Sequence, residues 1–135
     1  MSDFEKDMKK FAAKTKRKEN QLIRKFCLDL FGDVVQRSPV DTGRFRSNWQ
    51  PAIGAAASGV LDDEDKSGAK TKAKIGQSVS GAKVGDKIFL VNNLPYAQRL
   101  ESGWWSTQAP RGMVGLAVKR AQFIANKIGL ELKKI

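Results

Sequence analysis

The sequence contains no histidine and a single cysteine, Cys27, among its 135 residues. No disulfide can form within one chain, which suits a reducing compartment. A zinc site of histidine and cysteine, a cysteine–histidine pair and a serine–histidine–aspartate triad all need residues that this chain does not have. Many familiar catalytic centres are therefore excluded, and we expect no metal and no cofactor.

Long apolar segments are also missing. No run of about 18 apolar residues occurs, so no membrane-spanning helix is expected. The N-terminal stretch MSDFEKDMKKFAAKTKRK alternates charges and lacks the apolar core of a signal peptide. We therefore expect a protein that is neither exported by a signal peptide nor inserted in a membrane. The length suits a single domain that covers residues 1–135.

Acidic residues are outnumbered by basic ones. The chain has 25 Lys and Arg against 14 Asp and Glu, a formal charge of +11 and a pI near 10.0. Such a surface attracts polyanions, so nucleic acid or an acidic protein face is the natural partner. The same charge also keeps small proteins soluble, and no Arg-rich or Lys-rich block favours one explanation over the other. Both interpretations stay open.

Apolar residues recur at helical spacing over residues 3–36 and predict a long helix. They are Phe4, Met8, Phe11, Leu22, Phe26, Leu30 and Val34, with Thr15 at the same spacing. At about 1.5 Å per residue this helix would span on the order of 50 Å, which is longer than a small domain needs. We therefore expect its first part to protrude. Pro39 ends the helix because proline has no amide hydrogen to donate.

Two strands and two further helices are predicted beyond the long helix. The stretch FRSNWQP, residues 45–51, alternates as a half-buried strand does. The stretch DKIFLVNN, residues 86–93, is apolar on both faces, which predicts a central strand. Between them, residues 53–83 predict a long mobile loop or hairpin extension. A short helix follows in LPYAQRLESG, and a C-terminal helix after Pro110 is predicted to pack on the sheet.

The stretch SPVDTGRFRSNW contains Asp-Thr-Gly, the tripeptide of aspartic proteases. That chemistry needs two carboxylates that share a proton, from two copies of the tripeptide or from a homodimer. Here Asp41 follows a predicted helix and not an apolar strand. We favour a structural turn formed by Pro39, Asp41, Thr42 and Gly43. In this turn the Asp41 carboxylate would accept backbone hydrogen bonds and Gly43 would adopt a conformation that other residues resist. A dimeric protease is the least favoured alternative.

The order of the segments resembles the tail-completion and head-to-tail joining (neck) proteins of long-tailed bacteriophages, the group that includes the minor tail protein Z of lambda-like phages. The resemblance covers nearly the whole chain, and two blocks carry its specific signal. The first consists of Pro39, Asp41, Thr42, Gly43, Arg44 and Trp49, and the second of Asn92, Tyr96, Ala97, Leu100, Glu101 and Gly103. Ala109-Pro110 and Gly112-Met113 follow in the same order.

The resemblance implies an α+β fold, with a small antiparallel β-sheet packed against a long N-terminal helix and a C-terminal helix, and with a long flexible middle loop. It also implies a non-enzymatic virion protein. Six subunits would form a ring at the head-proximal end of the tail, in the virion neck, after assembly in the host cytoplasm. The implied partners are other copies of the chain, the head connector or adaptor proteins, the tail tube or tail terminator protein, and phage DNA contacted nonspecifically in the lumen.

A basic nucleic-acid-binding module is the alternative function. Such a module would show basic residues and stacking aromatics on a sheet, whereas the stretch IFLV is apolar.

Interface residues are predicted mainly from residue type. Aromatic side chains are enriched at binding hot spots, and Trp104 and Trp105 follow Gly103 in a predicted loop. Arg44 and Glu101 are expected to pair between the two blocks, within or between subunits. Tyr96 either joins the interface or packs in the core with its hydroxyl hydrogen-bonded. The predicted interface set is Arg44, Trp49, Tyr96, Glu101, Trp104 and Trp105.

Overall fold

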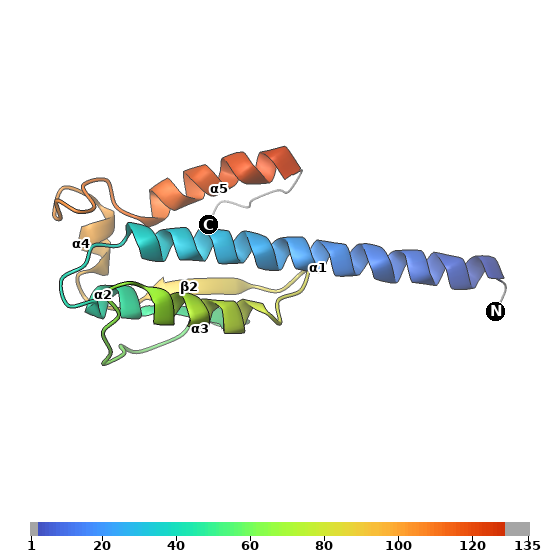
Figure 1. Cartoon of the computed structure of the whole chain (residues 1–135), viewed down its shortest axis with the longest axis horizontal. Helices are drawn as coiled ribbons and strands as arrows, with labels where there is room; N and C mark the ends of the chain where they lie inside the picture. Colours follow the sequence, from blue (N-terminus) through green and yellow to red (C-terminus); the bar gives the residue numbers. More distant parts are fainter. Residues whose placement is uncertain (1–2, 129–135) are drawn as a thin grey trace.

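Helices and a small antiparallel sheet form an α+β fold over residues 3–128, the part of the chain that the computed structural model describes (Figure 1). The elements are α1 (Asp3–Arg37), α2 (Arg44–Ser47), β1 (Trp49–Ile53), α3 (Ala69–Val79), β2 (Ile88–Asn92), α4 (Ala97–Glu101) and α5 (Val114–Ile128). The sheet and α3 lie on one side of α1, and α5 lies on the other (Figure 1). The predicted fold class is confirmed, with α1 as the element that the others pack around.

The long N-terminal helix is confirmed with nearly the predicted bounds. Its buried residues all come from the second half, and they are Cys27, Phe31, Val34 and Val35. Every side chain of residues 3–19 is exposed, and this part extends beyond the rest of the fold, as the sequence predicted (Figure 1). No helix within residues 3–128 is both long and apolar enough to cross a membrane. Only the second half of α1 therefore belongs to the core.

The prediction of a strand at residues 45–51 is wrong over the first part of that range. Arg44–Ser47 form the short helix α2, and β1 begins only at Trp49. The Ser47 amide donates to the Gly43 carbonyl at 3.0 Å, and the Asn48 amide donates to the Phe45 carbonyl at 3.1 Å. These bonds close a helical turn, because three alternating residues are too few to enforce an extended strand.

The middle segment is also more ordered than predicted. Residues 54–87 connect the two paired strands, and within the predicted loop of residues 53–83, residues 69–79 form helix α3. Thr71, Ile75 and Val79 recur every four residues, so they share one face of α3 and are buried in the core. Residues 54–68 follow an irregular path between β1 and α3. The loop prediction is therefore wrong where an amphipathic helix packs on α1 and β1.

Strand β2 is not central, contrary to the prediction. Within residues 3–128 the sheet has two strands, β1 and β2, paired antiparallel from Trp49↔Asn92 to Ile53↔Ile88. All five residues of β2 are half-buried, which suits an edge strand that is partly covered. Pro51 lies in β1, where an edge position tolerates a residue without an amide hydrogen.

The two later helices form where the sequence predicted them. The short helix is α4, and the C-terminal helix α5 is described as far as Ile128; the apolar spacing that predicts this helix includes Ile135, which lies outside the described residues. Ala117, Ala121 and Ala125 are buried on α5, whose principal neighbour is α1. The prediction that this helix packs on the sheet is wrong. The small alanine side chains suit close contact between the two helices.

Candidate functional site

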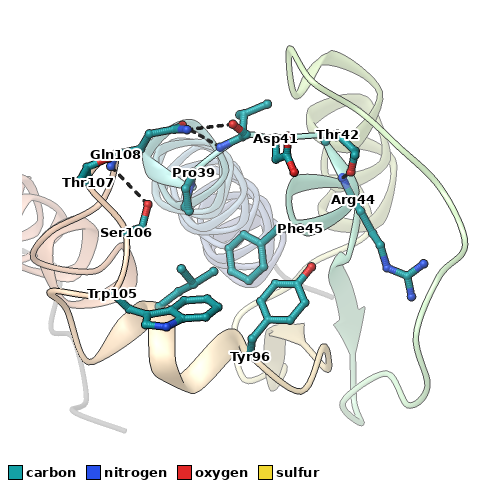
Figure 2. Close-up of a pocket in the computed structure, with 13 residues that line it drawn as sticks. Pro39, Asp41, Thr42, Arg44, Phe45, Tyr96, Trp105, Ser106, Thr107 and Gln108 are labelled. Atoms are coloured by element: carbon teal, nitrogen blue, oxygen red, sulfur yellow. Dashed lines mark hydrogen bonds between the residues drawn. The ribbon is translucent and has the colours of Figure 1, made fainter.

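The two sequence blocks meet around one open cavity of about 500 Å³ (Figure 2). Its walls come from residues 39–45, from Tyr96 and Leu100 beside and in α4, and from residues 105–108 of the loop before α5. The volume lies within the range of about 300–1,000 Å³ that is typical of ligand sites. The cavity is therefore the candidate functional site of this chain.

An aromatic row joins the core to the cavity. The Phe45 ring lies 5.7 Å from the Trp49 ring in an edge arrangement and 5.9 Å from the Tyr96 ring. Tyr96 in turn lies 6.2 Å from Trp105 at the surface. The side chain of Asn92 donates to the Phe45 carbonyl at 2.9 Å, which fixes the start of the second block against the first. The row links both blocks to the loop that bears the tryptophans.

Gln108 closes the cavity on the side of the turn. Its side-chain oxygen accepts the Val40 amide hydrogen at 2.8 Å, and its side-chain nitrogen donates to the Val40 carbonyl at 2.9 Å (Figure 2). This pair of bonds holds residues 105–108 beside residues 39–45. Our sequence reasoning missed Gln108, because a glutamine in a polar loop carries no signal of such a partner.

The Asp-Thr-Gly tripeptide bends the chain at the cavity wall. The Thr42 hydroxyl oxygen accepts the Arg44 amide hydrogen at 3.2 Å, a role that the sequence analysis assigned to the carboxylate of Asp41. Asp41 is exposed and Pro39 is half-buried. Gly43 has φ of +91°, and a Cβ there would lie 2.5–2.6 Å from the backbone of Asp65 and Lys66. The glycine is required because another segment passes directly against it.

The segment that covers Gly43 is itself held by a buried carboxylate. Asp65 accepts hydrogen bonds from the amide and the hydroxyl of Thr71, both at 2.8 Å. Burial raises the pKa of Asp65, but the hydrogen bonds from Thr71 and Gly68 outweigh burial and hold the pKa below its ordinary value. The ionised carboxylate thus fixes the beginning of α3 and, through its backbone, the turn at Gly43.

Arg46 connects the segment that packs on Gly43 to the end of α1 by hydrogen bonds. Its guanidinium donates to the carbonyls of Ser38, Lys66 and Gln36 at 3.1, 2.7 and 3.0 Å. Burial lowers the pKa of this guanidinium, and Asp65 partly opposes that effect. A cation near the C-terminal carbonyls of a helix is favourable, because those carbonyls carry partial negative charge.

Glu101 supports the N-terminus of α5 and does not pair with Arg44. Its carboxylate accepts the amide hydrogens of Met113, Val114 and Gly115 at 3.1, 2.7 and 3.0 Å. Arg44 instead lies 3.6 Å from the exposed Asp62 carboxylate. Arg44 and Glu101 therefore do not pair within the chain, because the Glu101 carboxylate accepts hydrogen bonds from the backbone of α5; a pair between subunits stays a prediction.

The remaining predicted interface residues differ in exposure. Trp49 is only 5% exposed and donates its indole N–H to the Ser38 hydroxyl at 2.8 Å, so it belongs to the core and not to a surface. Tyr96 is half-buried in the cavity wall. Trp104 is 87% exposed at φ +66°, and Trp105 is 52% exposed beneath Arg99, whose guanidinium carbon lies 5.5 Å from the ring. Trp105 lines the cavity, and the neighbouring Trp104 is exposed to solvent.

Two groups with shifted pKa values lie away from the cavity. Burial raises the pKa of the Cys27 thiol to about 11, so this thiol stays protonated and unreactive at neutral pH. Burial also lowers the pKa of Lys74, which donates to the Ser47 carbonyl at 3.2 Å. Among the side chains of residues 3–128, no group of three His, Cys, Asp or Glu is arranged to hold a metal ion.

Comparisons with models of known protein families, with curated proteins and with solved structures found no match to this chain.

Proposed function

We propose that this chain is a structural virion protein of a bacteriophage. It forms a ring at the head-proximal end of the tail, completes the tail, joins it to the head connector and leaves a channel for DNA. One observation carries the proposal. The two blocks on which the resemblance to tail-completion and joining proteins rests, residues 39–49 and 92–103, fold together into one unit around the cavity.

The roles of the block residues support a non-enzymatic protein. Gly43 lets a second segment pass, Trp49 fills the core, and Glu101 caps α5 with its carboxylate. These are framework roles, and such residues define a shared fold and not a reaction centre. The α+β fold class is the one that the resemblance implies, although α5 packs on α1 and not on the sheet.

The positive charge and the exposed aromatic side chains suit a protein that contacts neighbouring virion proteins on more than one side. A formal charge of +11 favours contact with acidic faces of connector, tail tube or tail terminator proteins. The same charge tolerates DNA in the lumen through phosphate contacts, which carry no sequence information. Trp104 and Trp105 offer the kind of exposed aromatic surface that is enriched at interfaces.

The proposal is tested with tails that were assembled without this protein. The purified chain is mixed with such tails and with DNA-filled heads, and joined particles are counted by electron microscopy and by infectivity. We expect the added chain to bind one end of the tail and to restore joining. Failure to associate with tails, heads or any other virion component would overturn the proposal.

A basic nucleic-acid-binding module is the second candidate, and the first part of α1 favours it. This exposed segment carries the basic residues Lys6, Lys9, Lys10, Lys14, Lys16, Arg17 and Lys18. Binding of the free chain to duplex DNA would then weaken steeply with salt, because counterions are released. That behaviour, together with the absence of binding to tails, would favour this candidate over the virion protein.

A further inference from the structure

The N-terminal arm, defined here as residues 3–19 of α1, presents an apolar stripe. Phe4, Met8 and Phe11 lie on one helical face and are 73%, 54% and 68% exposed. Most helices in proteins gain their stability by packing an apolar face, whereas every side chain of the arm is exposed. Three large apolar residues on such a face are typical of a helix that docks into an apolar groove.

The cavity offers a groove of matching chemistry. Phe45, Tyr96 and Trp105 supply aromatic surface in its walls. Asp41 lines the cavity and, within residues 3–128, forms no ion pair, whereas Arg44 in the same wall lies 3.6 Å from the Asp62 carboxylate. The arm is basic between residues 6 and 18, so its charge complements the unpaired Asp41 carboxylate.

The arm and the cavity lie at opposite ends of the molecule. The arm projects beyond the sheet at one end, while α2, α4 and the loop before α5 lie at the other (Figure 1). The stripe therefore cannot reach the cavity of its own chain. Contact between an arm and the cavity of another copy is head-to-tail, and head-to-tail contacts generate rings when the rotation between copies closes.

We propose that the arm of each copy docks in the cavity of the next copy, with Phe4, Met8 and Phe11 against Phe45, Tyr96 and Trp105. The inference rests on the proposed function, because it names the contact by which the subunits of the ring meet. Association of the purified chain follows from it even when no tail is present. The aromatic anchors in this contact are the residues that dominate its affinity.

The test compares an arm variant, Phe4→Ser with Phe11→Ser, and a cavity variant, Trp105→Ala, by sedimentation over a range of concentrations. Each change is expected to weaken self-association about 30-fold or more, as loss of a hot-spot residue does. Val118→Ser, at an exposed position on α5 outside both surfaces, is the matched control and is expected to associate normally. Thr107→Arg, also in the cavity wall, is a second cavity variant in case Trp105→Ala unfolds.

Mixing the two variants gives the sharpest result. The arm variant keeps an intact cavity and the cavity variant keeps an intact arm, so an equimolar mixture has one working contact per pair. We expect dimers and no larger assembly in this mixture, although each variant alone is monomeric at the same concentration. Pairing of arm with arm predicts the opposite, because the cavity variant alone would still associate.

Three results would overturn the inference. They are normal association of either variant, a mixture that stays monomeric, and a wild-type chain that is monomeric even at about 1 mM, the dissociation constant of a very weak contact. An arm variant that still forms rings on tails would remove this inference and leave the proposed function intact. Association that depends on arm and cavity, without any binding to tails, would remove the proposed function instead.

Discussion

At the scale of single residues, the backbone geometry of Gly43 explains the Asp-Thr-Gly tripeptide better than a catalytic role for Asp41 does. Its φ of +91° is one that residues with a side chain resist, and its missing Cβ leaves room for the backbone of Asp65 and Lys66. Its carbonyl accepts the amide hydrogens of both Ser47 and Asp65 at 3.0 Å. One glycine therefore connects the turn, α2 and the irregular segment before α3.

Gly43→Ala is expected to destabilise the fold far more than Gly85→Ala. Both glycines have similar φ, +91° and +93°, but nothing lies within 4 Å of a Cβ built on Gly85. The Gly85 variant thus carries the conformational cost alone, about 1–2 kcal/mol. The Gly43 variant must also displace a backbone segment. Urea unfolding at unchanged m-value measures the difference, and equal costs would contradict our account of the turn.

Asp65 is expected to make stability depend on acid pH. Its pKa is depressed in the fold, so its contribution is present above the unfolded pKa of about 3.9 and is lost as pH falls through the lower folded pKa. Asp65→Asn should lower the unfolding free energy by about 1–3 kcal/mol at pH 7. The difference from wild type should narrow below about pH 4. Asp62→Asn, at an exposed carboxylate, is the control, and a difference that is constant with pH would contradict the prediction.

At the scale of elements, the Glu101 carboxylate accepts the amide hydrogens at the beginning of α5. Glu101→Ala removes three hydrogen bonds from the first turn of α5. We expect faster hydrogen exchange at the amides of Met113, Val114 and Gly115 and a loss of about 1–3 kcal/mol in stability. Glu64→Ala, at an exposed carboxylate, should change neither quantity. Unchanged exchange in the Glu101 variant would show that the cap does not hold α5.

The two halves of α1 are expected to respond differently to the same kind of change. Phe4 and Phe11 are exposed in the arm, so Phe4→Ser with Phe11→Ser should leave the unfolding free energy of the monomer within about 0.5 kcal/mol per change. Phe31 is 8% exposed in the core, so Phe31→Ala should cost about 3–5 kcal/mol. Thermal or urea unfolding at low protein concentration measures both. Similar costs at the two sites would mean that the arm packs on its own chain.

The sequence predicts a helix or strand well where the apolar repeat of that element is long. Helix α1 was found because its apolar residues repeat over several turns, and its end was marked by Pro39. Helix α3 is not predictable from its sequence, because only Thr71, Ile75 and Val79 form its buried face among lysines, one glycine and other small residues. Helix α2 is not distinguished from a strand by its sequence, because Phe45, Ser47 and Trp49 alternate with polar residues as a half-buried strand would. Short elements are decided by distant partners and not by their own periodicity.

At the scale of the whole molecule, the sequence predicted the α+β class and the protruding arm but not the cavity. Residues 39–45 and 105–108 come together through Gln108 and Val40, which are 68 positions apart. No local pattern encodes a bond between an amide side chain and a distant backbone. The placement of the arm and the cavity at opposite ends follows from packing around α1, which the sequence alone does not specify (Figure 1).

The proposed function locates this chain at the head-proximal end of a phage tail. Its most direct measurement is electron microscopy of tails incubated with the chain carrying a visible label, with unlabelled chain as competitor. Our account predicts label only at the end of the tail that joins the head, with loss of label as unlabelled chain is added. Label along the tail tube, at the distal end or on no virion component at all would contradict it.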